Sequence, residues 1–300
     1  EKGFKSADLV LEREYRSKTV HQGYIEPHAA TVWWTPNDKI TIWSSSQGHF
    51  PVRSMTAELV GVKPGNIKVV PMEIGGGFGG KTVIYLEPIA AVLSKKTGKP
   101  VKMTMSRAEV IEATGPAPGS YMKVKMGVTN EGKITASQAD LRFEAGAYPG
   151  SPVGAAAICI FAPYNIENLS IDAYDVVTNK PKTTAYRAPG APLGAFAIES
   201  LIDEICEKLH IDPLEFRILN GAKEGTRRSY GMVNPRIGAI ETAQAAKDHQ
   251  HYSTPLEGPH RGRGVASGFW VNGSGHACAT AMVNFDGTVN LTIGSMDIGG

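Results

Sequence analysis

A glycine-rich segment between two apolar runs constrains this chain more than any other feature. Residues 69–88 read VVPMEIGGGFGGKTVIYLEP, with five glycines around one phenylalanine. Glycine adopts backbone conformations and close approaches that a Cβ forbids, so the segment predicts a tight loop between a strand and a helix. Such loops can present backbone N–H groups to phosphates and other anions. The loop is therefore the first candidate binding site.

One interpretation of the loop is a dinucleotide-binding turn. Gly75, Gly77 and Gly80 satisfy G-x-G-x-x-G after a predicted strand and before a predicted helix. Against it, the next predicted strand ends in Ser106-Arg107 without an acidic residue for a ribose, and Phe78 places a ring where the backbone must approach a pyrophosphate. A plain structural turn is the other alternative, because short glycine motifs often match by chance.

The rest of the chain predicts a mixture of strands and helices. Period-two alternation predicts strands at 39–47, 101–107, 120–129 and 133–148. Helical spacing predicts helices at 51–60, 83–97 and 191–209, followed by a helix with Asp212 as N-cap and Pro213 as its first residue. Strands and helices do not alternate strictly, so the predicted fold class is α+β, with mixed β-sheets and flanking helices.

Composition shifts between 222 and 264, where turn-rich segments bracket a short predicted helix. We therefore expect a first domain over 1–254, including a connection at 222–254, and the incomplete start of a second domain over 255–300. A hairpin turn is predicted there at Asp286-Gly287. The chain stops inside an apolar strand pattern, so we also expect a fragment of a longer protein.

Composition excludes several classes of function. The 31 basic and 29 acidic residues leave a net charge of +2, too balanced to favour nucleic acid or an anionic membrane, so a small molecule is the expected ligand. The longest apolar run, VGAAAICIF at 153–161, is far shorter than the roughly 20 residues that span a bilayer. The start does not resemble a signal peptide, and a cytoplasmic protein is expected.

Cysteine and histidine offer no metal site of their own. The three cysteines, Cys159, Cys206 and Cys278, are far apart and are expected to be small buried residues in a reducing compartment. An iron–sulfur cluster normally takes four cysteines, so any clusters must lie on another chain or segment. The eight histidines show no H-x-x-x-H pair, and no histidine metal site is predicted.

Four segments together carry a family resemblance. They are YIEPHAATVWW (24–34), WSSSQGHFPVRSMTAELVGV (43–62), GGGFGGK (75–81) and TAYRAPGAPLGAFAIESLIDEICEKLHIDPLEFRILN (184–220). In this order they resemble the large subunits of the molybdenum hydroxylases, the family of xanthine oxidase, aldehyde oxidase and carbon monoxide dehydrogenase. The resemblance runs from about residue 12 to the end, and RGRGVASGFW (261–270) resembles the start of the family's second molybdenum-binding domain.

The resemblance implies a cofactor site around Gln47, Gly77, Phe78, Gly79 and Arg187. Phe78 is expected to cover the metal, the Gly79 N–H to bind a metal ligand, and the Gln47 amide to donate to the apical oxygen. The Arg187 fork is expected beside the cofactor, where it can serve an anion. By residue type alone, Gln47 is typical of an exposed glutamine at the end of a strand, and Arg187 is typical of a solvated charge in a turn. Arg217 reads as an ordinary helix-face charge.

The family resemblance also implies the chemistry and the partners. The cofactor is molybdenum-molybdopterin, in its simple or its dinucleotide form, and the protein supplies no direct metal ligand. The general-base glutamate is expected beyond Gly300, so this piece alone is expected to be inactive. Electrons leave through iron–sulfur clusters, which implies an iron–sulfur subunit, with a flavin (FAD) subunit as a further option, besides the remainder of the molybdenum-binding subunit.

The substrate pocket departs from the family's purine-oxidising members. These members carry a glutamate where this chain has Thr82, and an arginine in a segment that here aligns Ala155, with no Arg or Lys between Arg142 and Lys180. The carbon monoxide branch places a cysteine after the motif arginine, and this chain has alanine there. An aldehyde or N-heteroaromatic substrate is expected, against a wall that includes Phe269 or Trp270.

Three alternatives remain open on the sequence. The alanine-rich segment around Ala155 is equally typical of a plain core helix. A nicotinamide-dependent dehydrogenase would use Gly75–Gly80 for its dinucleotide. A non-catalytic subunit would keep the fold without the cofactor.

Overall fold

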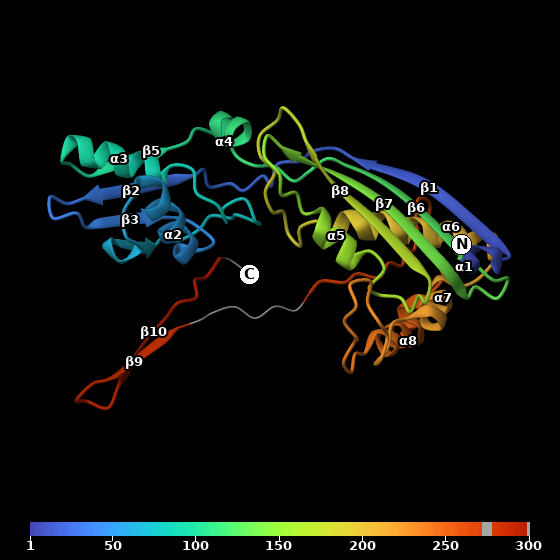
Figure 1. The fold of residues 1–300 in the computed structure, drawn as a ribbon. Helices are drawn as coiled ribbons and strands as arrows, with labels where there is room; N and C mark the ends of the chain where they lie inside the picture. Colours follow the sequence, from blue (N-terminus) through green and yellow to red (C-terminus); the bar gives the residue numbers. More distant parts are fainter. Residues whose placement is uncertain (272–277, 299–300) are drawn as a thin grey trace. The chain divides into compact units, whose positions relative to one another are not determined.

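The computed structural model describes residues 1–271 and 278–298, which form two compact units (Figure 1). The first unit comprises Glu1–Thr19, Pro118–Lys180 and Ala188–Val271. The second unit comprises Val20–Ala117, Pro181–Arg187 and Asn272–Gly300. Each unit is thus assembled from segments that are distant in the sequence. The domain boundary expected near residue 255 concerns family domains rather than compact units, and it stays a prediction.

The first unit is built on a mixed sheet with strand order β1-β6-β7-β8. Its pairs are antiparallel except for β7 and β8, which are parallel. Residues of β6 and β7 alternate between buried and more exposed positions, as their period-two sequences predicted. The strands are β1 (Leu9–Ser17), β6 (Ser120–Val128), β7 (Ile134–Gly146) and β8 (Leu169–Val177).

Two helices cover one face of this sheet (Figure 1). The long α6 (Ala191–Leu209) packs against β1 and β6, and α5 (Val153–Cys159) packs against β7 and β8. Ile198, Leu201 and Ile205 are buried on α6 at helical spacing, which explains why the sequence predicted this helix well. The remaining helices are α1 (Lys2–Lys5), α7 (Pro213–Asn220), α8 (Ala239–Asp248) and α9 (Gln250–Ser253).

The cap predicted for α7 is confirmed. Asp212 Oδ1 accepts hydrogen bonds from the N–H groups of Leu214 and Glu215, at 2.9 and 3.0 Å, and Pro213 is the first helical residue. The strand β8 was not predicted, because its residues from 172 onward are exposed and Asp175 interrupts the apolar series of residues 169, 171 and 173. The alanine-rich segment forms the short helix α5, with Ala156 and Cys159 buried and Ala155 partly buried.

The second unit is built on a sheet with strand order β4-β3-β2-β5. The strands β3 and β4 are parallel and are joined through α2, whereas β2 pairs antiparallel with both β3 and β5. A core that includes Val32, Ile40 and Ile42 lies between this sheet and its helices. The elements are β2 (Ala29–Trp34), β3 (Ile40–Ser44), α2 (His49–Val60), a 3₁₀ turn (Pro64–Asn66), β4 (Ile67–Pro71), α3 (Glu87–Thr97), β5 (Val101–Thr104) and α4 (Arg107–Ala113).

The C-terminal part of the second unit is the hairpin predicted at Asp286-Gly287. It pairs β9 (Ala279–Val283) with β10 (Val289–Ile293), and Gly287 has a φ of +80° in the turn. Cys278, expected to be buried like Cys159 and Cys206, is exposed just before this hairpin. Two strands with all residues exposed cannot enclose a side chain, which is why that expectation was wrong. In the part of the chain that the structure describes, no helix has the length and apolar character to cross a membrane.

Candidate functional site

The glycine-rich loop lies between β4 and α3 in the second unit, and its backbone is folded sharply. Gly79 has a φ of +107° and Phe78, unusually for a residue with a Cβ, a φ of +51°. The Gly80 N–H donates to Gly77 O at 2.8 Å, which closes a turn around Phe78. The helix α3 begins only at Glu87, so the glycines do not open a helix as a dinucleotide fingerprint requires. The helix predicted at 83–97 therefore starts four residues late.

The glycines are needed first for packing within the protein. A Cβ at Gly77 would lie 2.5 Å from Gln47 Oε1, and a Cβ at Gly79 would lie 2.4 Å from the carbonyl oxygen of Ala185. A Cβ at Gly80 would lie 2.6 Å from the ring of Tyr24. Real Cβ atoms do not approach so closely, so a side chain at any of these positions would displace Gln47, Ala185 or Tyr24.

Gln47, in the segment between β3 and α2, is the polar centre of the loop. The Gln47 Oε1 accepts hydrogen bonds from the backbone N–H groups of Gly79 and Lys81, at 2.8 and 3.2 Å. The backbone N–H of Gln47 donates to Lys81 O at 2.9 Å. Because both groups that contact the Gln47 side chain are N–H donors, the side-chain atom that faces the loop must be the amide oxygen and not the amide nitrogen. The Nε2 donor makes no hydrogen bond to any described residue.

Phe78 and Arg187 are brought to the same place. The Arg187 N–H donates to Phe78 O at 2.9 Å, which joins the loop to the turn that carries the arginine. The Phe78 ring is 46% exposed. The Arg187 side chain is exposed as well, and its guanidinium forms no ion pair or hydrogen bond within residues 1–271 and 278–298. Four of the predicted cofactor residues, Gln47, Gly77, Phe78 and Gly79, thus contact one another or Arg187.

The geometry differs from the expectation at Gly79. Its N–H was expected to bind a metal ligand, but here Gln47 accepts it. The unpaired donors of the loop are instead the N–H groups of residues 76–78, which form no hydrogen bond with the described part of the chain. Three consecutive free N–H groups, the Gln47 Nε2 and the Arg187 guanidinium together make a donor-rich surface suited to the oxygen atoms of an anion.

A buried polar network beneath the loop was missed by the sequence reasoning. Lys81 is 1% exposed, and its Nζ lies 2.6 Å from Glu26 Oε2 and 5.1 Å from the centre of the Tyr24 ring. Tyr24 Oη and His28 Nε2 form a hydrogen bond of 2.7 Å. A lysine next to glycines is typical of an exposed loop, so nothing in its type signalled burial.

Burial and hydrogen bonds together set the pKa values in this network. Burial lowers the pKa of Lys81 below its ordinary value, although the bond to Glu26 opposes this. Burial alone would raise the pKa of Glu26, but hydrogen bonds from Lys81 and from the Gly75 N–H outweigh it, and the pKa lies below its usual value. Burial, with the Lys81 charge as a second cause, lowers the pKa of His28 to about 4, so this ring is neutral at pH 7.

The predicted substrate residues do not form one cluster within either unit. Thr82 is exposed beside the loop in the second unit, and its Oγ1 donates to Gly79 O at 2.7 Å. Ala155 on α5 belongs to the first unit. Phe269 and Trp270 also belong to the first unit, where Trp270 is 45% exposed. Their joint role as a pocket wall stays a prediction.

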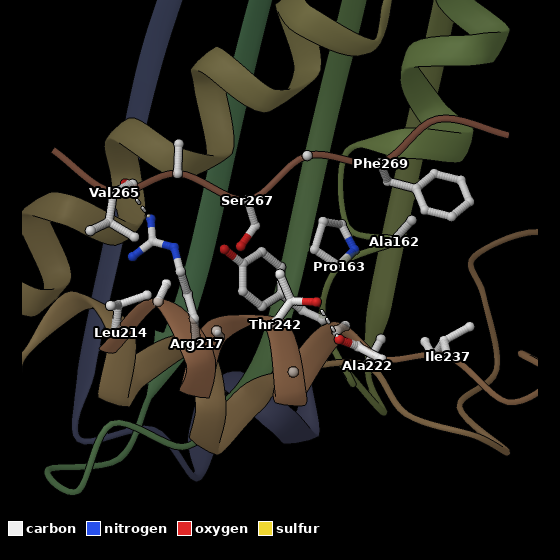
Figure 2. Close-up of a pocket in the computed structure, with 18 of the residues that line it drawn as sticks. Ala162, Pro163, Leu214, Arg217, Ala222, Ile237, Thr242, Val265, Ser267 and Phe269 are labelled. Carbon is white, nitrogen blue, oxygen red and sulfur yellow. Dashed lines mark hydrogen bonds between the residues drawn. The ribbon is translucent and has the colours of Figure 1, made fainter. Parts of the chain in front are cut away.

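Phe269 lines a cavity of about 880 Å³ within the first unit, between α7, α8 and the segment 263–269 (Figure 2). The Arg228 guanidinium lies 4.9 Å from the centre of its ring. None of Gln47, Phe78 or Arg187 lines this cavity. Its arginines Arg228 and Arg263 already donate to protein oxygens, so the cavity offers no free cation for a ligand from these two residues.

Arg217, expected to be an ordinary helix-face charge, is 3% exposed at the wall of this cavity. It forms an ion pair of 2.6 Å with Glu199 of α6. It also donates to Val265 O at 3.0 Å (Figure 2). Glu199 also accepts from Tyr164 Oη and from the Ser267 N–H. This buried network fastens the segment 265–267 to the helices, which gives Arg217 a structural role that its position on α7 did not reveal.

Comparison with known proteins identifies the family. The model of the molybdopterin cofactor-binding domain matches residues 1–221, nearly three quarters of the chain. The chain belongs to this family. The resemblance to the molybdenum hydroxylases is thereby confirmed, and so is the α+β fold with mixed sheets and flanking helices.

Curated relatives are about 30% identical to this family member over the aligned residues. The nicotinate dehydrogenase large molybdopterin subunit of Eubacterium barkeri is 29% identical over 82% of this chain and 59% of its own length. The putative xanthine dehydrogenase molybdenum-binding subunit of Escherichia coli K12 is 30% identical, over 98% of this chain and 41% of its own. The aldehyde oxidoreductase molybdenum-binding subunit of the same strain is 31% identical, over 99% and 41%. The chain therefore spans between about two fifths and three fifths of these relatives.

Solved structures agree with this assignment. The aldehyde oxidoreductase of Desulfovibrio desulfuricans superposes with a TM-score of 0.83 at 27% identity, over 95% of this chain and 33% of that one. The aldehyde oxidoreductase of Desulfovibrio gigas gives a TM-score of 0.79 at 26% identity, over 97% and 33%. The residues 1–221 matched by the family model include the glycine loop of the second unit together with most of the first unit.

Proposed function

We propose that this chain supplies part of the cofactor site in the catalytic subunit of a molybdenum-pterin hydroxylase. The observation that carries the proposal is the set of unpaired donors around the glycine loop: the N–H groups of residues 76–78, Gln47 Nε2 and the Arg187 guanidinium. Pterin phosphate and metal-bound oxygens are acceptors, so a donor-rich, cation-bearing loop fits this group. No described cluster of three or more His, Cys, Asp or Glu side chains is available to hold the metal directly.

The chain's own residues would hold and shield the group. When bound, the molybdenum–pterin cofactor supplies the oxygen-transfer and two-electron chemistry. Gln47 would donate through Nε2, because its Oε1 is fixed by the loop. Arg187 would balance anionic charge, and the exposed Phe78 ring would keep water away. The Gly77 and Gly79 positions would keep the loop closed around Gln47.

The complete enzyme is also a proposal. It would include the remainder of the subunit, with the general-base glutamate, and an iron–sulfur subunit, with or without a flavin subunit, in the cytoplasm. The boundary near 255 between two cofactor-binding domains belongs to the same proposal, and the family match to residues 1–221 supports its first domain.

For the substrate we propose an aldehyde or an N-heteroaromatic ring. Thr82 offers a neutral hydroxyl, already donating to Gly79 O, where purine-oxidising members place a carboxylate. The relatives named for nicotinate and for aldehydes support this class, although one named for xanthine is equally similar. A purine would leave polar ring atoms unpaired, at about 1 to 3 kcal/mol each. Ala155, Phe269 and Trp270 are the proposed apolar wall.

Two experiments on the full-length protein test these proposals. Metal and pterin analysis should find molybdenum with an extractable pterin. Quenching by nicotinamide cofactors without molybdenum would favour the dehydrogenase alternative instead, and neither signal would favour a non-catalytic subunit. For the substrate, kcat/KM should be higher for benzaldehyde or quinoline than for xanthine, and equal values would overturn the substrate proposal.

A further inference from the structure

A single carboxylate joins the two ends of the glycine loop. Glu26 Oε2 accepts a hydrogen bond from the Gly75 N–H at 2.6 Å and lies 2.6 Å from Lys81 Nζ. The Glu26 N–H in turn donates to Gly75 O at 3.1 Å. Gly75 and Lys81 begin and end the GGGFGGK motif, so the motif is closed into a ring through one side chain.

The second end of this ring is held on every side. The Lys81 N–H and C=O both bond to Gln47, while its side chain is wholly enclosed, with the Tyr24 ring beneath the ammonium group. A buried ammonium is costly unless it is paired, so Lys81 has a strong preference for the one position that meets Glu26. That position also fixes the backbone that meets Gln47.

Glycine at the first end of the ring is required by the same contact. A Cβ at Gly75 would lie 2.5 Å from Glu26 Cβ, so only glycine lets the carboxylate reach across the loop. Between the two ends lies Phe78, whose φ of +51° is sparsely populated for a residue with a Cβ. Backbone in such conformations persists only when its surroundings over-determine it. The closed ring is the surrounding structure that does so.

We propose that Glu26 and Lys81 are positioning residues, which hold the donors of residues 76–78 and the Gln47 amide in place for the bound cofactor. The proposal rests on the proposed function for the identity of the cofactor. Glu26 and Lys81 bond to Gly75, to Gln47 and to each other but not to the N–H groups of residues 76–78, so both are assigned to act through the loop and not on the reacting atoms. The ion pair is thus assigned to shaping the site rather than to chemistry.

The test uses the full-length protein with the variants Glu26→Gln, Lys81→Met and the double variant. Matched controls are Glu73→Gln and Lys68→Met, which remove the same charges at exposed positions just before the loop. Three quantities are measured: amide hydrogen exchange of a peptide covering residues 72–84, molybdenum per subunit, and turnover per molybdenum. The double variant has no unpaired buried charge, so it tests the proposal even where a single variant does not fold.

In the double variant, we expect stability and molybdenum content near wild type, but faster exchange at Gly75, Gly79 and Lys81. Turnover per molybdenum should fall about 10- to 100-fold, as for lost supports of other metal sites, with little change in KM. The controls should match wild type. If the double variant has the loop protection and the turnover of the wild type, each charge of the pair serves only to neutralise the other, and the proposal is overturned. Absence of molybdenum from the wild type would refute the proposed function, and the exchange result would still decide whether the pair holds the loop.

Discussion

Replacing Gly79 with alanine tests whether the conformation of the loop carries the site. Gly79 has a φ of +107°, and an added Cβ would lie 2.4 Å from Ala185 O and 2.6 Å from the carbonyl carbon of the same residue. Both are backbone atoms, so no side-chain rotation relieves the overlap. The Gly79 N–H also bonds to Gln47 at 2.8 Å, and a displaced loop would lose this bond.

The expected loss of stability of the closed loop combines the strain of a positive φ at alanine with the loss of this hydrogen bond. A sparsely populated backbone conformation costs about 1 to 3 kcal/mol, and a lost hydrogen bond about 0.5 to 1.5 kcal/mol. Together they destabilise the closed loop by roughly 1.5 to 4.5 kcal/mol, which raises its open fraction roughly 10- to 2,000-fold. The matched control is Gly61→Ala, at the end of α2. Its φ is also positive, at +72°, but nothing lies within 4 Å of the added Cβ.

The assay compares the two variants in the full-length protein by amide exchange, molybdenum content and turnover. Gly79→Ala should speed exchange of residues 72–84 and lower both molybdenum content and turnover. Gly61→Ala should cost about 1 to 2 kcal/mol, confined to the end of α2, and leave the loop protected. The reasoning fails if Gly79→Ala leaves exchange in the loop and molybdenum content as in the wild type.

Three further predictions address other parts of the chain. Gln47→Ala should lower turnover by about 10²- to 10³-fold at unchanged molybdenum content, whereas the same truncation at the exposed Gln138 should do nothing measurable. Because burial lowers the pKa of His28 to about 4, its neutral ring stabilises the fold fully above pH 6.5. That stability is lost as pH falls toward 4, by about 2 kcal/mol between pH 7 and 5, so urea midpoints at these two pH values should differ less in His28→Phe than in the wild type. Arg217→Met leaves Glu199 buried without its cation and should destabilise the first unit by about 3 to 5 kcal/mol in urea unfolding. A smaller loss of stability in the variant that also carries Glu199→Leu would show that the unpaired charge is the cause.

Regular elements could be predicted from the sequence wherever one face is buried. The period-two runs of β6 and β7 and the helical spacing of α6 reflect direct contact with the core of the first unit. The strand β8 could not be found in this way, because it joins the sheet by backbone pairing while much of its surface stays exposed. Nor could the assembly of each unit from distant segments be predicted from the sequence, since contacts between such segments leave no local periodicity.

Part of the candidate site could likewise be predicted from the sequence, and part could not. Gln47, Phe78 and Arg187 were named through the family resemblance, and the structure brings them to one loop. The Glu26–Lys81 pair was not named, although both residues lie inside the quoted motifs. Its partners are 55 residues apart, and the lysine is of a type that is usually exposed. The burial of Lys81 is evident only in the three-dimensional structure.

The structure changes what the glycine motif means. A phosphate-binding turn needs glycines so that a ligand can approach the backbone, but here the Cβ positions of Gly75, Gly77 and Gly79 are filled by Glu26, Gln47 and Ala185. Each glycine therefore accommodates a specific protein group beneath the loop, and the free N–H donors follow from the shape that these contacts impose. A sequence with the same glycines but other residues beneath the loop would not be held in this conformation. The motif alone is thus weak evidence for a cofactor site, and it becomes strong evidence only together with the residues that pack against it.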